Sequence, residues 1–257
     1  MQIVTLGPAG TYSHRAARAV DNNVGFKESV SAIVAAVDTE EYERGVVPIE
    51  NSIEGSVTET LDSIADSDVA VTQEIVTPIR HALLAQSSEF ELIASHSQAL
   101  AQCRSYLEDT YPDVRAEAVA STARGVERAR EDPGVAGIGH PDNAGDVLTV
   151  ISEDIQDRSS NATRFFVVAP ESERVTAGGR STVVVYPNAN YPGLLLELLE
   201  AFADRDINLS RIESRPSGNR LGDYLLRAQE ALKSIESIAT DGWVKRLGSY
   251  DRRHVVE

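Results

Sequence analysis

Short apolar runs alternate with segments of helical period through the first 170 residues. The runs have the length and β-branched content of buried strands, and the segments between them place apolar residues three and four apart. The candidate strands are residues 2–6, 45–49, 69–73, 79–84, 91–94, 135–138 and 164–168. The candidate helices are residues 13–22, 29–38, 56–65, 98–109 and 122–131, several opening at a Ser or Thr that can cap them. This alternation predicts βαβ units, and therefore an α/β fold with mostly parallel sheets.

A change of pattern after residue 168 indicates a second domain. Residues 169–174 and the pair Gly178-Gly179 form the best candidate linker. Beyond it, the candidate strands are 181–186, 207–211, 221–228 and 243–250, and the candidate helices are 191–204 and 229–240. In chain order these elements give βαββαβ, the pattern of a ferredoxin-like domain. The third strand runs into the second helix with almost no loop, so we expect that strand to be shortened.

Two polar segments lie at the ends of predicted strands, where α/β proteins hold their ligands. Residues 160–168 place a neutral hydroxyl, Thr163, beside a fixed cation, Arg164. Residues 46–57 read as a buried strand, a polar elbow around Asn51, and the start of a helix. Taken alone, the first segment favours a packing role for the threonine and a solvated charge for the arginine.

Seven motifs in chain order change that interpretation. They are residues 6–13, 47–52, 95–100, 121–123, 163–165, 192–195 and 212–216. Together they resemble the prephenate dehydratase family, whose enzymes make phenylpyruvate in phenylalanine synthesis. The resemblance covers nearly the whole chain, and its last two motifs resemble the ACT-type regulatory domain of the family.

The resemblance implies an α/β catalytic domain with two lobes and a cleft between them, like a periplasmic binding protein. We place this domain at residues 1–172. Its first lobe takes about 1–77 and 155–170, and its second lobe about 78–154. A ferredoxin-like ACT domain is expected at residues 177–257.

The resemblance also assigns roles in the cleft. We expect Thr163 to donate a hydrogen bond to the leaving hydroxyl of prephenate, and Arg164 to hold the pyruvyl carboxylate bidentately. Asn51 and Gln98 complete the expected catalytic set. Four further residues are expected to position or enclose the substrate: Thr11, Ser52, Ser121 and Phe165. Ser97 stands where the family commonly has proline, so we expect a less rigid loop there.

Two ionisable residues near these motifs are given structural roles. Glu50 precedes a predicted helix, and its negative charge is expected to interact favourably with the dipole of that helix. His96, beside another helix start, is expected to be a structural hydrogen-bonding residue. No His, Cys or carboxylate group in the sequence has the spacing of metal ligands, so we predict neither a metal nor a cofactor.

The C-terminal motifs resemble the phenylalanine site at an interface between two ACT domains. The implied effector-binding residues are Pro192, Gly193, Leu194, Leu195, Glu213, Ser214, Arg215 and Pro216. The helix N-terminus would face the carboxylate of the effector, with Leu194 and Leu195 against its ring. The resemblance therefore implies feedback regulation by L-phenylalanine in a homodimer or homotetramer.

Two other functions remain open at this point. Arogenate dehydratase, a sibling activity, would need an anchor for the ammonium group of its substrate, and the sequence offers no unique carboxylate for it. A non-catalytic amino-acid-binding sensor could share the fold. The Thr163-Arg164 pair favours catalysis, because a binder has no use for a donor aimed at a leaving group.

Composition narrows the list of partners. The net charge is −16 over 257 residues, and the first 176 residues hold 29 acidic and 13 basic side chains. Such a surface repels nucleic acid and anionic membranes, so we expect neither as a partner. Three lysines stand against 21 arginines, which resembles proteins of halophilic organisms.

The single cysteine, Cys103, excludes an internal disulfide and is expected to be a buried packing residue. No run of the sequence has the length of a membrane span, and the chain opens directly on a candidate strand without a signal peptide. We therefore expect a cytoplasmic protein.

Overall fold

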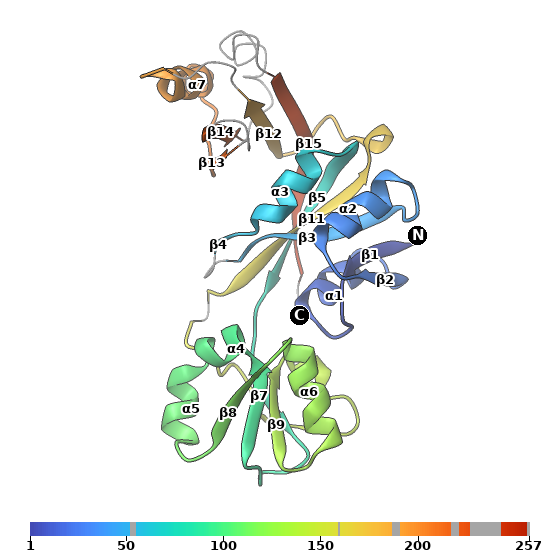
Figure 1. Cartoon of the computed structure of the whole chain (residues 1–257), viewed down its shortest axis with the longest axis vertical. Coiled ribbons are helices and arrows are strands. Elements are labelled where there is room, and N and C mark those ends of the chain that lie inside the picture. Colours follow the sequence, from blue (N-terminus) through green and yellow to red (C-terminus); the bar gives the residue numbers. More distant parts are fainter. Residues whose placement is uncertain (52–54, 159, 187–190, 217–220, 227–242, 256–257) are drawn as a thin grey trace.

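The computed structural model describes residues 1–51, 55–158, 160–186, 191–216, 221–226 and 243–255. The molecule is elongated, with a C-terminal domain at one end, a first lobe in the middle and a second lobe at the other end (Figure 1). The last described residue, Val255, packs in the first lobe against a core cluster that includes Ala16 and Ala17 of its first helix.

A mixed sheet forms the first lobe. Its strands follow the order β5-β11-β3-β1-β2, with β4 paired to β3. The strands are β1 (Ile3–Leu6), β2 (Val24–Lys27), β3 (Arg44–Asn51), β4 (Gly55–Ser56), β5 (Val69–Pro78) and β11 (Ala162–Pro170). Helices α1 (Tyr12–Arg18), α2 (Val30–Asp38) and α3 (Thr58–Ala65) belong to this lobe, and the 3-10 turn η2 (Glu171–Glu173) follows β11. The strands predicted at 2–6, 45–49, 69–73 and 164–168 are confirmed.

A second sheet, in the order β10-β6-β9-β7-β8, forms the second lobe. Its strands are β6 (Ala82–Ala85), β7 (Leu92–His96), β8 (Arg115–Val119), β9 (Val135–Gly139) and β10 (Thr149–Ser152). Around it lie α4 (Ser97–Gln102), α5 (Arg104–Thr110), α6 (Thr122–Glu131) and the 3-10 turn η1 (Pro141–Asn143). A Cβ at Gly125 would lie 2.3 Å from the Ala94 carbonyl oxygen. Glycine therefore lets α6 rest directly on β7.

The C-terminal domain has a ferredoxin-like strand order. It contains β12 (Arg180–Tyr186), α7 (Leu194–Ala203), β13 (Glu213–Pro216), β14 (Leu221–Leu226) and β15 (Trp243–His254). The strands lie in the order β13-β14-β12-β15, and each neighbouring pair is antiparallel. This is the arrangement expected for βαββαβ connectivity. The predicted helix at 229–240 lies outside the described residues.

Strand β15 joins the C-terminal domain to the first lobe. Its first part pairs with β12, and residues 251–254 then pair in parallel with residues 73–76 of β5. One continuous sheet of ten strands results, whereas the sequence predicted a strand that ends at residue 250. Tyr250 is buried against the ring of Phe166, with the two ring centroids 5.3 Å apart. The two domains therefore share a core and cannot move as independent bodies without breaking it.

A side chain of β15 also contacts the end of helix α3. The Lys245 ammonium donates to the carbonyl oxygens of Ile64, Ala65 and Ser67 around the end of the helix, at 3.2 Å and 2.7 Å for the first two. A cation at a helix C-terminus satisfies carbonyls that lack intrahelical partners and is favoured by the helix dipole. This contact fixes the helix that follows the Asn51 elbow to the C-terminal domain.

Several predicted elements differ from those observed. Residues 207–211 are irregular, and the strand expected there, β13, begins only at Glu213. The helix predicted at 98–109 is divided into α4 and α5 at Cys103, which is buried as predicted. Strands β2, β8 and β10 were not predicted. Burial raises the pKa of the Cys103 thiol to about 12, consistent with a packing role.

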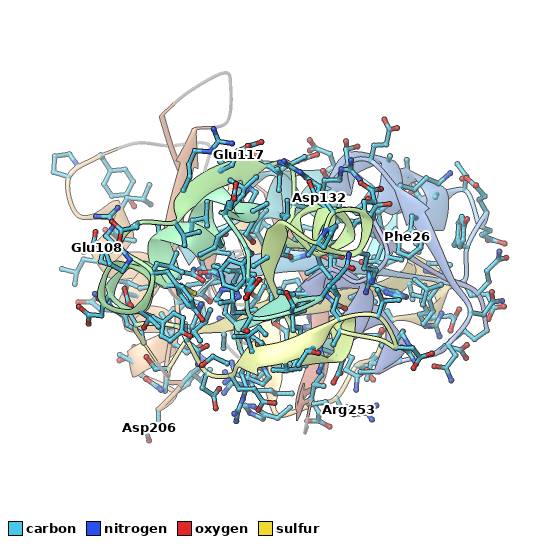
Figure 2. The ribbon with its side chains drawn as sticks, turned by 90° about the horizontal axis from the view of Figure 1, so that it is seen from below. Phe26, Glu108, Glu117, Asp132, Asp206 and Arg253 are labelled. Carbon is cyan, nitrogen blue, oxygen red and sulfur yellow. The ribbon has the colours of Figure 1, made fainter. Side chains whose placement is uncertain are left out.

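Acidic side chains such as Glu108 and Asp132 lie on the outside of the second lobe (Figure 2). Across the residues that the structure describes, none of the helices combines the length and the apolar character that a membrane crossing requires.

Candidate active site

A cavity of about 400 Å³ lies between the two lobes. The first lobe contributes the β1–α1 turn and the ends of β3 and β11, and the second lobe contributes the starts of α4 and α6. Among the described residues that line it, none is Asp, Glu, Lys or Arg. The cavity is therefore walled by neutral hydrogen-bonding groups and apolar side chains.

Thr163 lies at the first-lobe wall of this cavity and is 9% exposed. It is directly opposite Asn51 in the antiparallel pairing of β11 with β3. The Asn51 side-chain amide donates a hydrogen bond to the Thr163 hydroxyl oxygen at 2.9 Å. Because the hydroxyl oxygen accepts this bond, the hydroxyl proton remains available for a ligand.

Gln98, near the start of α4, faces the same cavity from the second lobe. Its side-chain nitrogen is buried and has no hydrogen-bond partner among the described residues. A buried amide donor without a partner is costly in a folded protein, so it marks a place where a ligand acceptor would be welcome.

Thr11 and Ser121 line the cavity at the starts of α1 and α6. Each side chain caps its helix: Thr11 accepts from the backbone N–H of His14, and Ser121 from that of Arg124. The sequence motifs around these two residues thus bring hydroxyl groups of both lobes to one cavity. Phe165 forms part of the wall and is buried, while Ser52 lies outside the described residues.

A connected set of lining residues was missed in the sequence. His81 Nε2 lies 2.8 Å from Gln102 Oε1, which also accepts from the Asn161 amide at 3.0 Å. Tyr12 completes the set, since its hydroxyl donates to the Arg80 carbonyl beside His81. Burial lowers the pKa of His81 below its usual value, so the imidazole is neutral at physiological pH. No sequence signal pointed to His81, which the prediction placed inside the strand at 79–84, whereas it precedes β6 in the structure.

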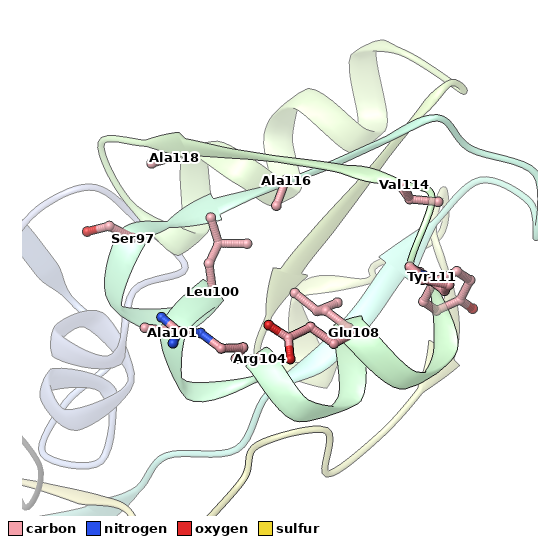
Figure 3. Close-up of a pocket in the computed structure, with 11 residues that line it drawn as sticks. Ser97, Leu100, Ala101, Arg104, Glu108, Tyr111, Val114, Ala116 and Ala118 are labelled. Carbon is pink, nitrogen blue, oxygen red and sulfur yellow. The ribbon is translucent and has the colours of Figure 1, made fainter.

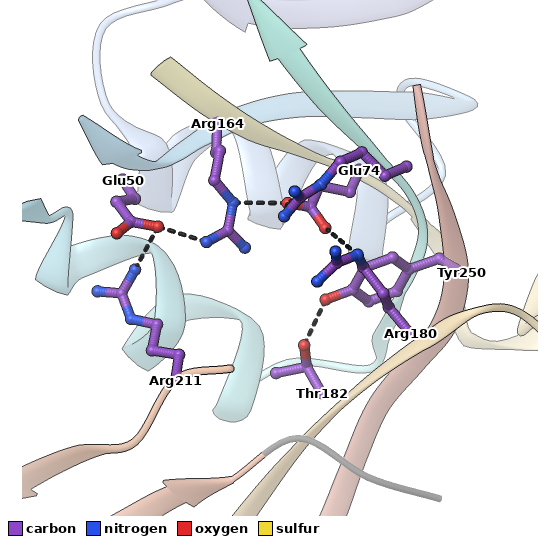
Figure 4. Close-up of polar contacts among 8 residues, drawn as sticks. Glu50, Glu74, Arg164, Arg180, Thr182, Arg211 and Tyr250 are labelled. Carbon is purple, nitrogen blue, oxygen red and sulfur yellow. Dashed lines mark hydrogen bonds and ion pairs between the residues drawn. The ribbon is translucent and has the colours of Figure 1, made fainter. Parts of the chain in front are cut away.

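Arg164 lies outside the lining of the cavity. Side chains alternate along β11, and Thr163 takes the cavity face. The Arg164 guanidinium donates to Glu50 and, at 2.5 Å, to Glu74 (Figure 4). Its expected contact with the pyruvyl carboxylate stays a prediction.

Glu50 has the structural role that the sequence indicated, but for another reason. Its carboxylate pairs with Arg164 and with Arg211 of the C-terminal domain, not with a helix N-terminus. His96 serves its helix as expected: its Nδ1 accepts the backbone N–H of Gln98 at 3.3 Å. Ser97 lines a separate groove on the outside of the second lobe.

That outer groove lies between α4, α5 and β8 and is larger, at about 550 Å³ (Figure 3). Its walls are mostly apolar, with Leu100, Ala116 and Ala118 facing it and Arg104 and Glu108 at its border. It lacks the converging hydroxyl and amide groups of the cleft. The chemistry therefore favours the smaller cavity as the active site.

The expected effector residues lie on two elements of the C-terminal domain. Gly193, at φ +101°, precedes α7, and the backbone of residues 213–216 forms β13, whose side chains are outside the description. Leu194 is buried with Val183 and Leu198 in the domain core. Leu194 thus packs in the domain core, whereas Leu195 is half-buried. Their expected contacts with the effector ring stay predictions.

Fold and site together define a two-lobed α/β protein that encloses a small ligand in a neutral cleft and carries a ferredoxin-like domain. Comparison with known proteins makes the class specific. The family model for prephenate dehydratase matches residues 3–173. The chain therefore belongs to the prephenate dehydratase family.

Individual relatives agree. The chain is 36% identical to the bifunctional chorismate mutase/prephenate dehydratase of Aquifex aeolicus, covering 98% of this chain and 74% of the relative. It is 35% identical to the prephenate dehydratase of Methanocaldococcus jannaschii, covering 95% of each. The crystal structure of the Arthrobacter aurescens prephenate dehydratase with L-Phe superposes with a TM-score of 0.85 at 33% identity, covering 98% of this chain and 90% of that one.

Family membership gives the reaction. The protein is a carbon–oxygen lyase of phenylalanine biosynthesis, which removes water and carbon dioxide from prephenate to give phenylpyruvate. The cleft between the lobes has the size and the hydrogen-bonding groups that a small polar substrate requires.

Proposed function

We propose that Thr163 is the hydrogen-bond donor that assists the departure of the prephenate hydroxyl. The observation that carries this assignment is the Asn51 amide, which donates to the Thr163 oxygen at 2.9 Å. That bond fixes the side chain and turns its own proton toward the cavity. The Thr163 hydroxyl lies near the start of β11, at the wall of the cavity between the two lobes.

A threonine suffices because the reaction needs little help. Loss of water and carbon dioxide leaves an aromatic ring, and aromatisation supplies most of the driving force. The protein has only to stabilise negative charge on the leaving oxygen. One placed donor in a water-poor site contributes roughly 10²-fold or more.

Neutral groups suit the rest of the substrate. A strong ion pair with the departing carboxylate would stabilise the ground state and slow its loss. Gln98, Ser121 and Thr11 supply uncharged hydrogen-bonding groups around the cavity, and Phe165 supplies apolar wall. Ser52 belongs to this set by its place in the motif.

Regulation by L-phenylalanine is the second part of the proposal. The Arthrobacter aurescens relative was crystallised with L-Phe, and the C-terminal domain here has a ferredoxin-like strand order. We assign the effector site to Pro192, Gly193 and Leu195 with Glu213, Ser214, Arg215 and Pro216, between two copies of the chain. The active unit would then be a homodimer or a homotetramer.

The donor role is tested by Thr163→Val, which keeps the shape of the side chain and removes its hydroxyl. We expect kcat to fall at least about 100-fold with KM changed little, since the bond matters most in the transition state. Thr163→Ser is the matched control and should keep most of the rate. If the valine variant retains more than about a tenth of the parent kcat, Thr163 is not the essential donor.

A further inference from the structure

We propose that Arg211, on the C-terminal domain, is a positioning residue for the catalytic hydroxyl. It lies in the irregular segment 204–212 that joins α7 to β13, outside the cleft. Through Glu50 it reaches the two strands that carry Asn51 and Thr163. The inference rests on the proposed donor role of Thr163 and adds to it a link from the C-terminal domain.

The link begins with one shared carboxylate oxygen. Arg211 Nη1 lies 2.8 Å from Glu50 Oε2, and the same oxygen accepts from Arg164 Nη1. The Arg211 and Arg164 side chains are 16% and 17% exposed, so this cluster is largely withdrawn from water. Screening by salt is weak there, and each charge senses the position of the others.

Strand register carries the link to the cavity. Glu50 is paired with Arg164, and the next pair along the same two strands is Asn51 with Thr163. The first pair lies on the face toward the C-terminal domain and the second on the cavity face. A shift of Glu50 along β3 therefore moves the Asn51 amide that holds the Thr163 oxygen.

The pairing is irregular at this point. The register of β11 against β3 shifts between Arg164 and Phe165, directly beside the catalytic pair. A strand irregularity leaves backbone less constrained than a regular ladder and is a common way to aim a side chain at a site. The position of Thr163 thus depends on side-chain contacts in addition to the ladder.

Arg164 also contacts a second carboxylate, that of Glu74. Glu74 is fully buried and accepts from Arg164 at 2.5 Å and from Arg252 of β15 at 2.8 Å, with Arg180 of β12 at 3.9 Å (Figure 4). Arg164 is therefore held between two carboxylates. The arginines that contact Glu74 all come from strands of the sheet, whereas Glu50 is also contacted by Arg211 from a connecting segment. The adjustable side of the cluster is the one that Arg211 contacts.

The contact between Arg211 and Glu50 lies close in the sequence to the expected effector site. Arg211 stands two residues before β13, the strand to which we assign effector binding. A ligand that reorders this strand would change the contact between Arg211 and Glu50, and with it the orientation of the Thr163 hydroxyl. Coupling between two sites of a protein typically changes a binding or activity parameter about 5- to 150-fold.

The test is a double-mutant cycle on kcat with Arg211→Ala, Glu50→Gln and the double variant. We expect Arg211→Ala to lower kcat about 5- to 30-fold, within that range of couplings, with KM within about twofold of the parent. In the Glu50→Gln background the same change should have a much smaller effect, because the ion pair with Arg211 is already lost. Arg205→Ala, in the same domain and bonded to the Ala201 carbonyl, is the control and should leave kcat unchanged.

Arg211→Lys distinguishes a role of the Arg211 charge from a role of its packing. The same variant tests the inference if Glu50→Gln does not fold. A lysine keeps the charge, so kcat should return to within about threefold of the parent. The inference is overturned if Arg211→Ala has the parent kcat, if its penalty is the same in both backgrounds, or if lysine restores nothing. Loss of activity in Arg211→Ala while Thr163→Val stays active would instead remove the donor role and leave the C-terminal link standing.

Discussion

Thr163 and Arg164 follow each other on β11, and their side chains therefore leave the strand on opposite faces. Thr163 meets Asn51 at the cavity, and Arg164 meets Glu50 and Glu74 at the C-terminal domain. We therefore propose two purposes for the pair: Thr163 for the chemistry, and Arg164 for the junction with the neighbouring domain. An arginine suits the second purpose because its planar guanidinium can bond two carboxylates at once.

A prediction at the residue scale concerns Gln98. Replacing it with Glu puts a carboxylate into a neutral cavity that must accept a dianion, so we expect KM for prephenate to rise at least about tenfold. Gln98→Met removes only the hydrogen bond and should cost about 1 kcal/mol, close to a fivefold change in kcat/KM. Steady-state kinetics of the two variants with prephenate measure both KM and kcat/KM. An equal effect of Glu and Met would mean that charge at this position is irrelevant.

Part of the site could be predicted from sequence, and the reason is local. Thr163, Asn51 and Gln98 stand in motifs that resemble those of the prephenate dehydratase family, and the resemblance implied a cleft around them. Strand alternation next to Thr163 indicates that the Arg164 side chain leaves β11 on the opposite face. His81 and Gln102 could not be predicted, because their contact depends on how α4 packs beside the segment that leads into β6.

At the scale of elements, strands buried on both faces were predicted and edge or half-exposed strands were missed. The strand at residues 135–139 is apolar and fully buried, so its pattern is unmistakable. Strand β8, in contrast, is an edge strand with exposed Arg115 and Ala116, and only its pairing with β7 defines it. The strand predicted at 207–211 failed because Ile207 and Leu209 pack on the domain core from an irregular segment.

Gly248 offers a test of the junction between β15 and β5. A Cβ at this position would lie 2.0 Å from the Val71 carbonyl oxygen, so Gly248→Ala must push the two strands apart. We expect a loss of about 2 kcal/mol in the free energy of unfolding, roughly 4–8 °C in Tm for a chain of this size. Thermal unfolding followed by circular dichroism measures it.

The matched control is Gly179→Ala in the preceding linker. A Cβ there would lie 3.3 Å from a side-chain oxygen of Asp251, which can move aside. Its Tm should stay within about 2 °C of the parent, as for most surface substitutions. Equal Tm values for the two variants would show that β15 does not pack on β5 as closely as described.

At the scale of the whole molecule, the two lobes contact each other directly through α1 and the turn before it on one side and η1 on the other. Arg15 of α1 pairs with Asp142 of η1 and lies 3.0 Å from His140 Nδ1, and the Asn143 amide donates to the Gly10 carbonyl at 2.8 Å. Burial and the nearby Arg15 lower the pKa of His140 to about 4. The contact between the lobes therefore requires a neutral histidine.

This requirement predicts how stability depends on pH. The unfolded chain binds a proton at His140 near pH 6.5 and the folded chain only near pH 4, so stability is complete above about pH 6.5 and falls as the pH drops toward 4. The contribution of this residue is at most about 3 kcal/mol. Urea unfolding at pH 7.5 and pH 5.0 should show the loss, and His140→Asn should reduce it. An unchanged difference in that variant would contradict the assignment.

The central claim is tested most directly by the rate at which the purified chain forms phenylpyruvate from prephenate, with and without added L-phenylalanine. We predict turnover by the chain alone, preference for prephenate over arogenate in a parallel assay, and progressive suppression as phenylalanine is added. Turnover without suppression would contradict the regulatory role of the C-terminal domain. Absence of turnover by protein shown to be folded would contradict the reaction itself.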